Sequence, residues 1–249
     1  MHPKIILIVT LIACTFAACK KNSDKTPNGA SNKVKLYIQD ARNTPLNTID
    51  SFAMTYDNSN RLISQVSSKE KFVYTYSGNT SFTMDLYELG QLSIHEIGYV
   101  GSNNFLDSTF QFNDTQDSST EKYFYNGTLL TNKISYDYSN HLSTVNMRES
   151  FTYDNNGNLI KDVQTAVGPG VSTTTTFTYT DKPIQFALSP SFVPVQAKNL
   201  PATQSQTDPA GNKIATVTYS YEFDSQGRIT KETDAISGGY TVIKTYVYY

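Results

Sequence analysis

The chain has 249 residues, with 20 basic and 22 acidic side chains, so its formal net charge at pH 7 is -2. This balance excludes a nucleic-acid binder that works by bulk charge, because such proteins need a surplus of Lys and Arg to replace phosphate counterions. A hydrophobic fraction of 38% against a charged fraction of 17% indicates a chain that can bury a core. Beyond residue 13 no stretch is apolar enough for a spanning helix, which excludes a polytopic helical membrane protein.

The N-terminal segment, residues 1–18, predicts export. A weakly basic start is followed by an apolar run at 5–13, the length of a secretory signal and short of the roughly 20 residues that a spanning helix needs. The run ends in Phe16-Ala17-Ala18-Cys19, which resembles the lipobox of bacterial lipoproteins. This resemblance implies cleavage between Ala18 and Cys19 and acyl chains such as palmitate on Cys19, which anchor the protein in a membrane. An ordinary signal peptide with a chance cysteine is the alternative.

The cysteine count and the next residues fit a lipid anchor. Cys14 and Cys19 are the two cysteines of the chain, so the mature protein would carry no thiol for a disulfide or for catalysis. The polar residues that follow Cys19 predict a flexible tether, so that 19–33 form the lipidated start of the mature chain. Lys20 and Lys21, by resemblance to the sorting rules of enteric bacteria, argue against retention in the inner membrane. We therefore expect a lipid anchor in the outer membrane, with the periplasmic or surface side left open.

Residues 34–249 predict a single all-β domain. In Thr216–Phe223 the apolar and aromatic residues alternate with Thr, Ser and Glu, a period of two that is typical of strands with one packed and one wet face. The same alternation appears at 72–76, 151–153, 176–180 and 240–249. We therefore expect consecutive antiparallel hairpins that form a curved, barrel-like meander sheet.

A recurring turn sequence connects several of these strands. An aromatic residue precedes Asp, two polar residues, Gly or Asn, a polar residue, and then Leu or Ile. The Asp side chain can accept a backbone N–H two residues on, and Gly or Asn suits the position that needs a positive φ. The turn residues of the four copies are Asp57 and Asn60, Asp137 and Asn140, Asp154 and Gly157, and Asp224 and Gly227.

This turn sequence resembles the YD repeat of Rhs-type β-shell proteins, most clearly at 153–159 and 223–229. Together with the lipobox and the chain length, it resembles more closely the bacterial lipoproteins of unknown function that have a porin-like β-fold. The resemblance covers roughly 34–249 and implies a fold, not an activity. The copies are few and unevenly spaced, and no toxin-like domain follows Tyr249, which sets the chain apart from true Rhs proteins.

One segment interrupts the alternation. Five of the nine prolines lie between Asp181 and Gly211, which predicts a long irregular loop at about 181–211. Apolar residues between the prolines indicate that the loop packs against the sheet. It would either close the core or form a flap or plug over one end of the sheet, where it could contribute to function.

The sequence predicts no catalytic residue, cofactor or metal site. His95 and His141 stand apart from other zinc ligands, and the pair His95 and Glu96 is common on any strand. The loop at 154–158 fails the calcium pattern, because its glycine is at the fourth position and residue 12 is Thr165. Sequences for phosphate-binding loops and serine nucleophiles are absent.

The prediction for function is a non-enzymatic envelope lipoprotein that binds or scaffolds. The 18 Tyr and 13 Phe either form the core or line a site for a small hydrophobic molecule or a glycan in a sheet cavity. An envelope protein is the other kind of partner, and nucleic acid is not expected. A hydrolase with an unrecognised carboxylate site and a lipid-embedded porin are the remaining alternatives. The polar residues opposite the aromatics argue against the porin.

Overall fold

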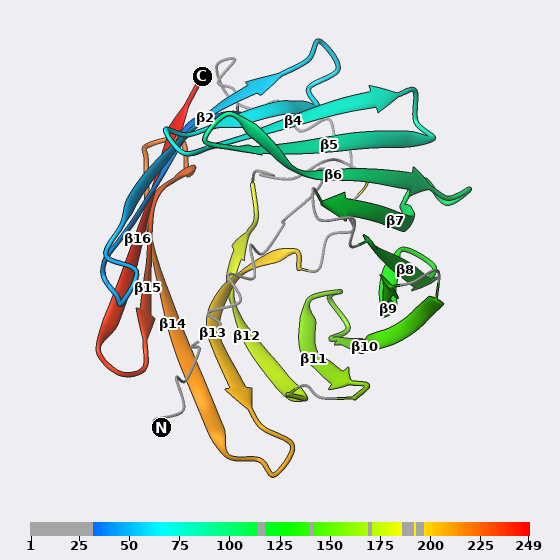
Figure 1. Cartoon of the computed structure of the whole chain (residues 1–249). Coiled ribbons are helices and arrows are strands. Elements are labelled where there is room, and N and C mark those ends of the chain that lie inside the picture. Colours follow the sequence, from blue (N-terminus) through cyan, green and yellow to red (C-terminus); the bar gives the residue numbers. More distant parts are fainter. Residues whose placement is uncertain (1–31, 114–117, 140–141, 169–170, 186–191, 193–196) are drawn as a thin grey trace, which may run out of the picture.

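In the computed structural model, the described residues are 32–113, 118–139, 142–168, 171–185, 192 and 197–249, and they form a closed barrel of 16 strands (Figure 1). The expected signal peptide, Cys19 and most of the tether lie outside these residues, as do Asn140 and His141. No helix within the described ranges is long and apolar enough to cross a membrane.

The strands follow one another along the whole described chain. They are β1 (Val34–Asn43), β2 (Ile49–Tyr56), β3 (Leu62–Val66), β4 (Glu70–Ser77), β5 (Ser81–Glu88), β6 (Gln91–Val100), β7 (Leu106–Asn113), β8 (Ser118–Asn126), β9 (Leu129–Ser139), β10 (Leu142–Tyr153), β11 (Leu159–Ala166), β12 (Thr173–Pro183), β13 (Asn199–Thr207), β14 (Lys213–Phe223), β15 (Ile229–Ile236) and β16 (Tyr240–Tyr248).

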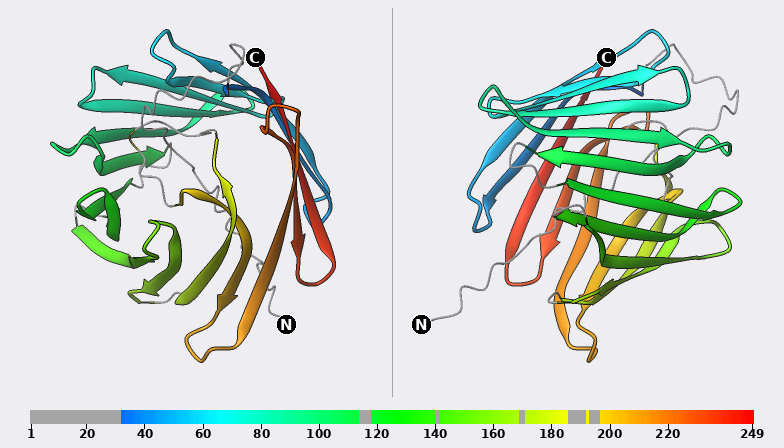
Figure 2. Two further views of the ribbon diagram at one scale, coloured as in Figure 1. Left: turned by 180° about the vertical axis from the view of Figure 1, so that it is seen from behind. Right: turned by 45° about the vertical axis from the view of Figure 1, so that its right-hand side comes forward.

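Each strand pairs antiparallel with its neighbours in sequence, and β1 pairs with β16 to close the wall, for example Tyr37 with Tyr246 (Figure 2). The prediction of an all-β meander of consecutive hairpins is confirmed. The curved sheet closes completely, and closure leaves no unpaired sheet edge for another chain to join.

The alternation of side chains gives the barrel an inner and an outer face. Because all the elements of the described residues are strands of the wall itself, the buried residues of each strand point into the barrel. They form three apolar clusters, the largest of which joins both ends of the described chain: Val34, Met54, Leu62, Leu200, Ile229 and Tyr246. Tyrosines and phenylalanines from many strands pack against these clusters.

Both ends of the described chain lie at the same end of the barrel, which we call the terminal end. The backbone N–H of Tyr249 donates to the carbonyl of Lys33 at 3.1 Å. Because the strands alternate in direction, the connections β2–β3, β10–β11, β12–β13 and β14–β15 all lie at this end. The turns that contain Asp57, Asp154 and Asp224 therefore lie at the same end of the barrel, although they are far apart in the sequence.

The three Asp turns share one geometry. The Asp57 carboxylate accepts the backbone N–H groups of Ser59 at 2.9 Å and Arg61 at 2.8 Å. Asp154 and Asp224 accept equivalent bonds from the residues two and four positions later. The fourth residue of each turn has a positive φ, namely Asn60 at 65°, Gly157 at 82° and Gly227 at 78°.

Two positions differ from the expected turn pattern. Asp137 lies inside β9, paired with Thr144 of β10, and its carboxylate accepts the Asn146 side chain at 2.6 Å instead of opening a turn. Conversely, Asp208 opens an unexpected turn in which Asn212 donates to its carboxylate at 2.8 Å and Gly211 has φ 86°. Thr207 occupies the position where the motif has an aromatic residue, so this turn does not match the motif.

The proline-rich segment is more regular than expected. β12 extends to Pro183, and β13 occupies Asn199–Thr207, well inside the range expected to be irregular. Pro201 is accommodated because it sits at a break in the register with β12, where its missing N–H removes no ladder bond. The Tyr221 hydroxyl donates to the Pro201 carbonyl at 2.9 Å from the other side.

Candidate functional site

Tyrosine hydroxyls brace the barrel wall at the terminal end. In five hairpins a tyrosine near the end of an even strand donates to a carbonyl near the start of the preceding odd strand, at distances of 2.5–2.9 Å. The donors and acceptors are Tyr76 and Leu62, Tyr125 and Leu106, Tyr179 and Leu159, Tyr221 and Pro201, and Tyr248 and Ile229. Each brace spans a place where two neighbouring strands separate.

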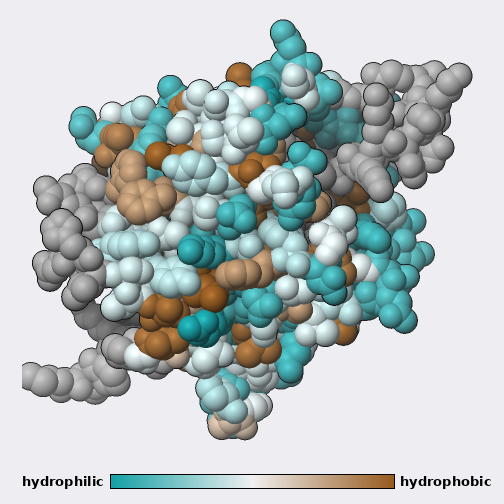
Figure 3. Space-filling model, turned by 90° about the vertical axis from the view of Figure 1, so that its right-hand side faces the viewer, coloured by the Kyte–Doolittle hydropathy of each residue, from teal (hydrophilic) through white to brown (hydrophobic). Residues whose placement is uncertain are grey.

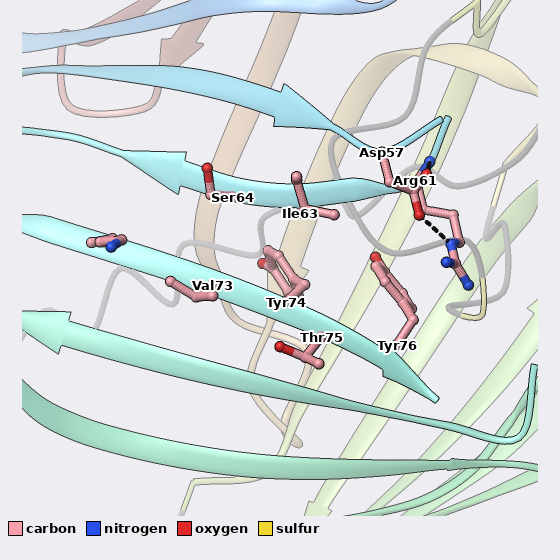
Figure 4. Close-up of a pocket in the computed structure, with 9 residues that line it drawn as sticks. Asp57, Arg61, Ile63, Ser64, Val73, Tyr74, Thr75 and Tyr76 are labelled. Carbon is pink, nitrogen blue, oxygen red and sulfur yellow. Dashed lines mark hydrogen bonds and ion pairs between the residues drawn. The ribbon is translucent and has the colours of Figure 1, made fainter. Parts of the chain in front are cut away.

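The separation of β3 and β4 opens a pocket of about 480 Å³ (Figure 4). The ladder between these strands ends at the pair Ser64 and Val73, and beyond it the Tyr76 hydroxyl bridges to Leu62 at 2.7 Å. Tyr74 and Tyr76 line the pocket, and Ser64 and Thr75 add hydroxyl groups.

Arg61 holds the end of this pocket at the Asp57 turn. Its guanidinium pairs with Asp57 at 2.7 Å, lies 4.4 Å from the centre of the Tyr76 ring and donates to the Gly78 carbonyl at 3.1 Å. Desolvation raises the pKa of the Asp57 carboxyl, but the hydrogen bonds and charge of Arg61 outweigh it, so the pKa lies below its usual value. Burial raises the pKa of Tyr76 to about 12, and the hydroxyl therefore remains a donor at neutral pH.

A second pocket of about 480 Å³ adjoins the first and shares Lys71 with it. It lies between the β3–β4 and β5–β6 turns, and Ser67, Ser68 and Tyr87 are among its lining residues. The Lys71 ammonium lies 5.9 Å from the centre of the Tyr87 ring. We call the two pockets together the wall groove, because they follow β4 along the barrel wall.

Inside the barrel, Lys133 organises a group of carboxylates. Its ammonium pairs with Glu121 and with Glu149, each at 2.9 Å. Burial, together with the charge of Glu121, raises the pKa of the nearby Glu96 to about 7. Burial and the charge of Glu149 raise the pKa of Asp162 to about 7 as well. Asp162 is 5% exposed, and its Oδ1 atom is buried without a hydrogen-bond partner among the described residues.

A second lysine occupies the opposite part of the interior. The Lys244 ammonium pairs with Glu232 at 2.7 Å and Asp234 at 2.8 Å, and the Tyr246 hydroxyl donates to Glu232 at 3.1 Å. Burial raises the pKa of Asp234 despite the charge of Lys244. These buried ion pairs and the aromatic clusters line the inner face of the barrel.

The pair His95 and Glu96 does not form a catalytic unit. Adjacent residues of a strand point to opposite faces, and Glu96 faces the interior. His95 lies on the outer face, where it pairs with Asp85 and stacks on Phe112 at 4.8 Å between ring centres. Among the described side chains, no group of three or more His, Cys, Asp or Glu residues could hold a metal ion.

Part of the proline-rich segment reaches the far side of the barrel. Phe192, between β12 and β13, is buried and stacks on Phe82 of β5 at 6.0 Å between ring centres. Its carbonyl accepts the backbone N–H of Leu106 at the start of β7. Since β5 and β7 lie five or more strands from β12, Phe192 connects distant parts of the wall.

One of the predicted turn residues lines the wall groove, and the others that the structure describes lie elsewhere. Asp57 lines it, whereas Asp154 and Asp224 belong to other turns of the terminal end. Sequence reasoning missed Arg61 and Lys71. Arg61 could have been noticed because it follows the turn aspartate at the position also occupied by Arg228, while nothing in the sequence distinguishes Lys71 from other strand lysines.

The nearest-neighbour pairing and complete closure define an up-and-down β-barrel. Two solved structures share this fold. One is a porin-like protein from Bacteroides uniformis ATCC 8492, with 12% identity, a TM-score of 0.62, and coverage of 88% of this chain and 99% of that chain. The other is a porin-like protein from Bacteroides vulgatus ATCC 8482, with 11% identity, a TM-score of 0.63, and coverage of 87% and 98%.

These similarities show the fold alone. The predicted porin-like fold is confirmed, whereas the lipoprotein and the YD repeat stay predictions. No family model matches the chain, and no curated protein matches it.

Proposed function

We propose that this chain is a non-enzymatic binding protein of the cell envelope, held at the outer membrane by lipid on Cys19, with its barrel in water. The observation that carries this proposal is the polarity of the outer wall. Lys122, Arg148 and Lys161 lie on the outer face of β8, β10 and β11 and are exposed. A Lys or Arg facing lipid costs about 2–4 kcal/mol at the middle of a bilayer, so three of them favour water.

The rest of the outer face supports the same conclusion. The outward positions of β12, β13 and β14 are mostly Thr or Ser, and Thr178 and Thr203 share a hydrogen bond of 2.7 Å across two strands. On the flank seen in Figure 3, hydrophobic side chains form small groups among hydrophilic ones rather than a continuous band. A barrel with this surface needs a separate anchor, and the predicted lipid on Cys19 supplies one.

The geometry of the tether is compatible with this arrangement. The segment from Cys19 to Lys33 can span roughly 50 Å when extended. It would join the barrel at the terminal end, where β1 begins. At this distance from the membrane the wall groove, which runs along the side of the barrel, would stay accessible.

Substitution of the predicted lipidated cysteine tests the anchor. We expect Cys19→Ala to abolish incorporation of labelled palmitate and to move the protein from the membrane fraction to the soluble fraction. Cys14→Ala, inside the predicted signal peptide, is the matched control and should leave both unchanged. Palmitate labelling and membrane retention that persist in Cys19→Ala would refute the lipid anchor.

A thermal-shift screen of the full chain in detergent tests binding. The pools are neutral glycans, acidic glycans, fatty acids and steroids. A ligand at 100 times its Kd should stabilise the fold by about 2.7 kcal/mol, which is a shift of several degrees in Tm. A reproducible hit supports a small-ligand binder. A failure of every pool would overturn this part of the proposal and direct attention to a protein partner, for which cross-linking on intact cells is the assay.

A further inference from the structure

We infer that the wall groove binds an extended acidic glycan, a chain of uronic-acid sugars, with Lys71 at its centre facing a sugar carboxylate. This inference rests on the proposed binding function and adds the site and the class of ligand. The evidence is the shape of the groove, its charge and the chemistry of its walls.

The shape favours a chain over a compact molecule. Two pockets of equal volume, about 480 Å³ each, adjoin along β4 and share Lys71. One reaches the Asp57 turn at the terminal end, and the other reaches the turns β3–β4 and β5–β6 at the opposite end. The eight residues of β4 span roughly 26 Å, and the two pockets together extend along most of this strand.

The charges in the groove differ in whether they are already neutralised. Arg61 pairs with Asp57, and Lys69 pairs with Asp50 at 3.1 Å. Lys71 is exposed, and none of the ion pairs between the described residues includes it. Glu70, the residue before it on β4, also lines the second pocket. The junction of the two pockets therefore carries a positive charge without an ion-pair partner in the described part of the chain, and this charge can bind an anion.

The remaining lining groups suit sugars. Thr75 on one side of Lys71 and Ser68 on the other offer hydroxyls that can donate and accept hydrogen bonds. The Ser64 and Ser67 hydroxyls are bonded within the protein, to Thr55 and to the backbone of the β3–β4 turn. The Tyr87 ring, beside Lys71, offers an apolar face with a polar tip. Sugar rings present the same mixture of hydroxyl groups and C–H faces, and a uronic acid adds the carboxylate that Lys71 would pair with.

The geometry disfavours an added peptide strand at this place. A strand could pair with β4 only where β3 separates from it, beyond Val73. There the Tyr76 side chain crosses the gap and bonds to Leu62. The same brace occurs in four other hairpins, so it belongs to the wall and would have to be displaced by a strand.

The test measures binding of hexagalacturonate by calorimetry to the full chain in detergent, with neutral maltohexaose as the comparison. We expect hexagalacturonate to bind and Lys71→Gln to weaken that binding at least tenfold. Lys122→Gln is the matched control, because Lys122 is also an exposed lysine of the outer wall, 5.8 Å from the centre of the Tyr136 ring. The control should bind as the unaltered protein does.

Three outcomes would overturn the inference: no binding of hexagalacturonate at millimolar concentration, equal binding of maltohexaose, or equal weakening by Lys71→Gln and Lys122→Gln. The last would indicate general attraction of an anion to surface lysines. Failure here is distinguishable from failure of the proposed function. A hit with a fatty acid or a neutral glycan in the thermal-shift screen would keep the binding function while refuting the acidic glycan.

Discussion

The Asn158 side-chain oxygen accepts the backbone N–H of Lys198 at 2.8 Å. It also accepts the N–H of Asn199 at 3.0 Å, and Asn158 itself is 3% exposed. The Asp154 turn therefore anchors the chain where it returns to the wall at β13. In the other two motif turns of this end the equivalent residues are Arg61 and Arg228, whose guanidinium groups pack on Tyr76 and Tyr248 instead.

Loss of this anchor should destabilise the barrel. We expect Asn158→Ala to lower the free energy of unfolding by about 1–3 kcal/mol, because two backbone donors lose their acceptor. Asn156→Ala is the control, since Asn156 is exposed in the same turn. Urea denaturation measures both variants. Equal midpoints for Asn158→Ala and the unaltered protein would show that water replaces the Asn158 amide without cost.

Phe192 should contribute to the stability of the barrel through its packing in the interior. Phe192→Ala removes a buried ring that stacks on Phe82, and we expect a loss of about 3–5 kcal/mol in the free energy of unfolding. Phe124→Ala, on the exposed face of β8, should cost much less. If the two substitutions shift the thermal midpoint equally, Phe192 does not connect the two parts of the wall.

The positive φ of the Asp turns predicts that replacing their glycine with a larger residue lowers the free energy of unfolding. At Gly157, φ is 82° and an added Cβ would lie 3.1 Å from the Lys198 ammonium. Gly157→Val should therefore destabilise by about 1–3 kcal/mol through backbone strain. The reverse change, Asn60→Gly at the equivalent position, should leave stability nearly unchanged. Unaltered thermal stability of Gly157→Val would count against the strained turn.

The buried carboxyl of Asp162 predicts a dependence of stability on pH. Its pKa of about 7 in the folded protein is above its ordinary value, so the folded state holds this proton more tightly than the unfolded state. The contribution to stability is fully present at pH below the ordinary value of about 4 and is lost as pH rises through 7.

Asp162→Asn should remove this dependence. At pH 8.5 the variant should be more stable than the unaltered protein by roughly 1–2 kcal/mol, because no buried charge forms. At pH 4.5 the difference should largely disappear. Denaturation at both pH values measures the effect, and a difference of equal size at the two values would contradict it. Glu222→Gln, at an exposed residue of β14, is the control.

Local patterns in the sequence predicted much of the fold. A period of two with β-branched and aromatic residues determines strands, and Asp followed by Gly or Asn determines tight turns, because both depend on interactions a few residues apart. Consecutive hairpins follow from these patterns, and so does a meander. The irregular loop expected at 181–211 was wrong in part, because proline density does not reveal that Pro201 would fall at a break in register.

The tertiary structure decided what depends on distant residues. Closure requires β1 to meet β16, a pairing of Tyr37 with Tyr246 that no local signal contains. Closure also selects which strand face is inside. It therefore buries Lys133 and Lys244 with their carboxylates, and it places Glu96 inside and His95 outside. By itself the sequence determined most of the strands and three of the four predicted turns, and the lipid anchor stays its prediction. The position of Lys71 between two pockets arises only from the arrangement of β3, β4 and β5 in space, since a pocket is defined by its walls together.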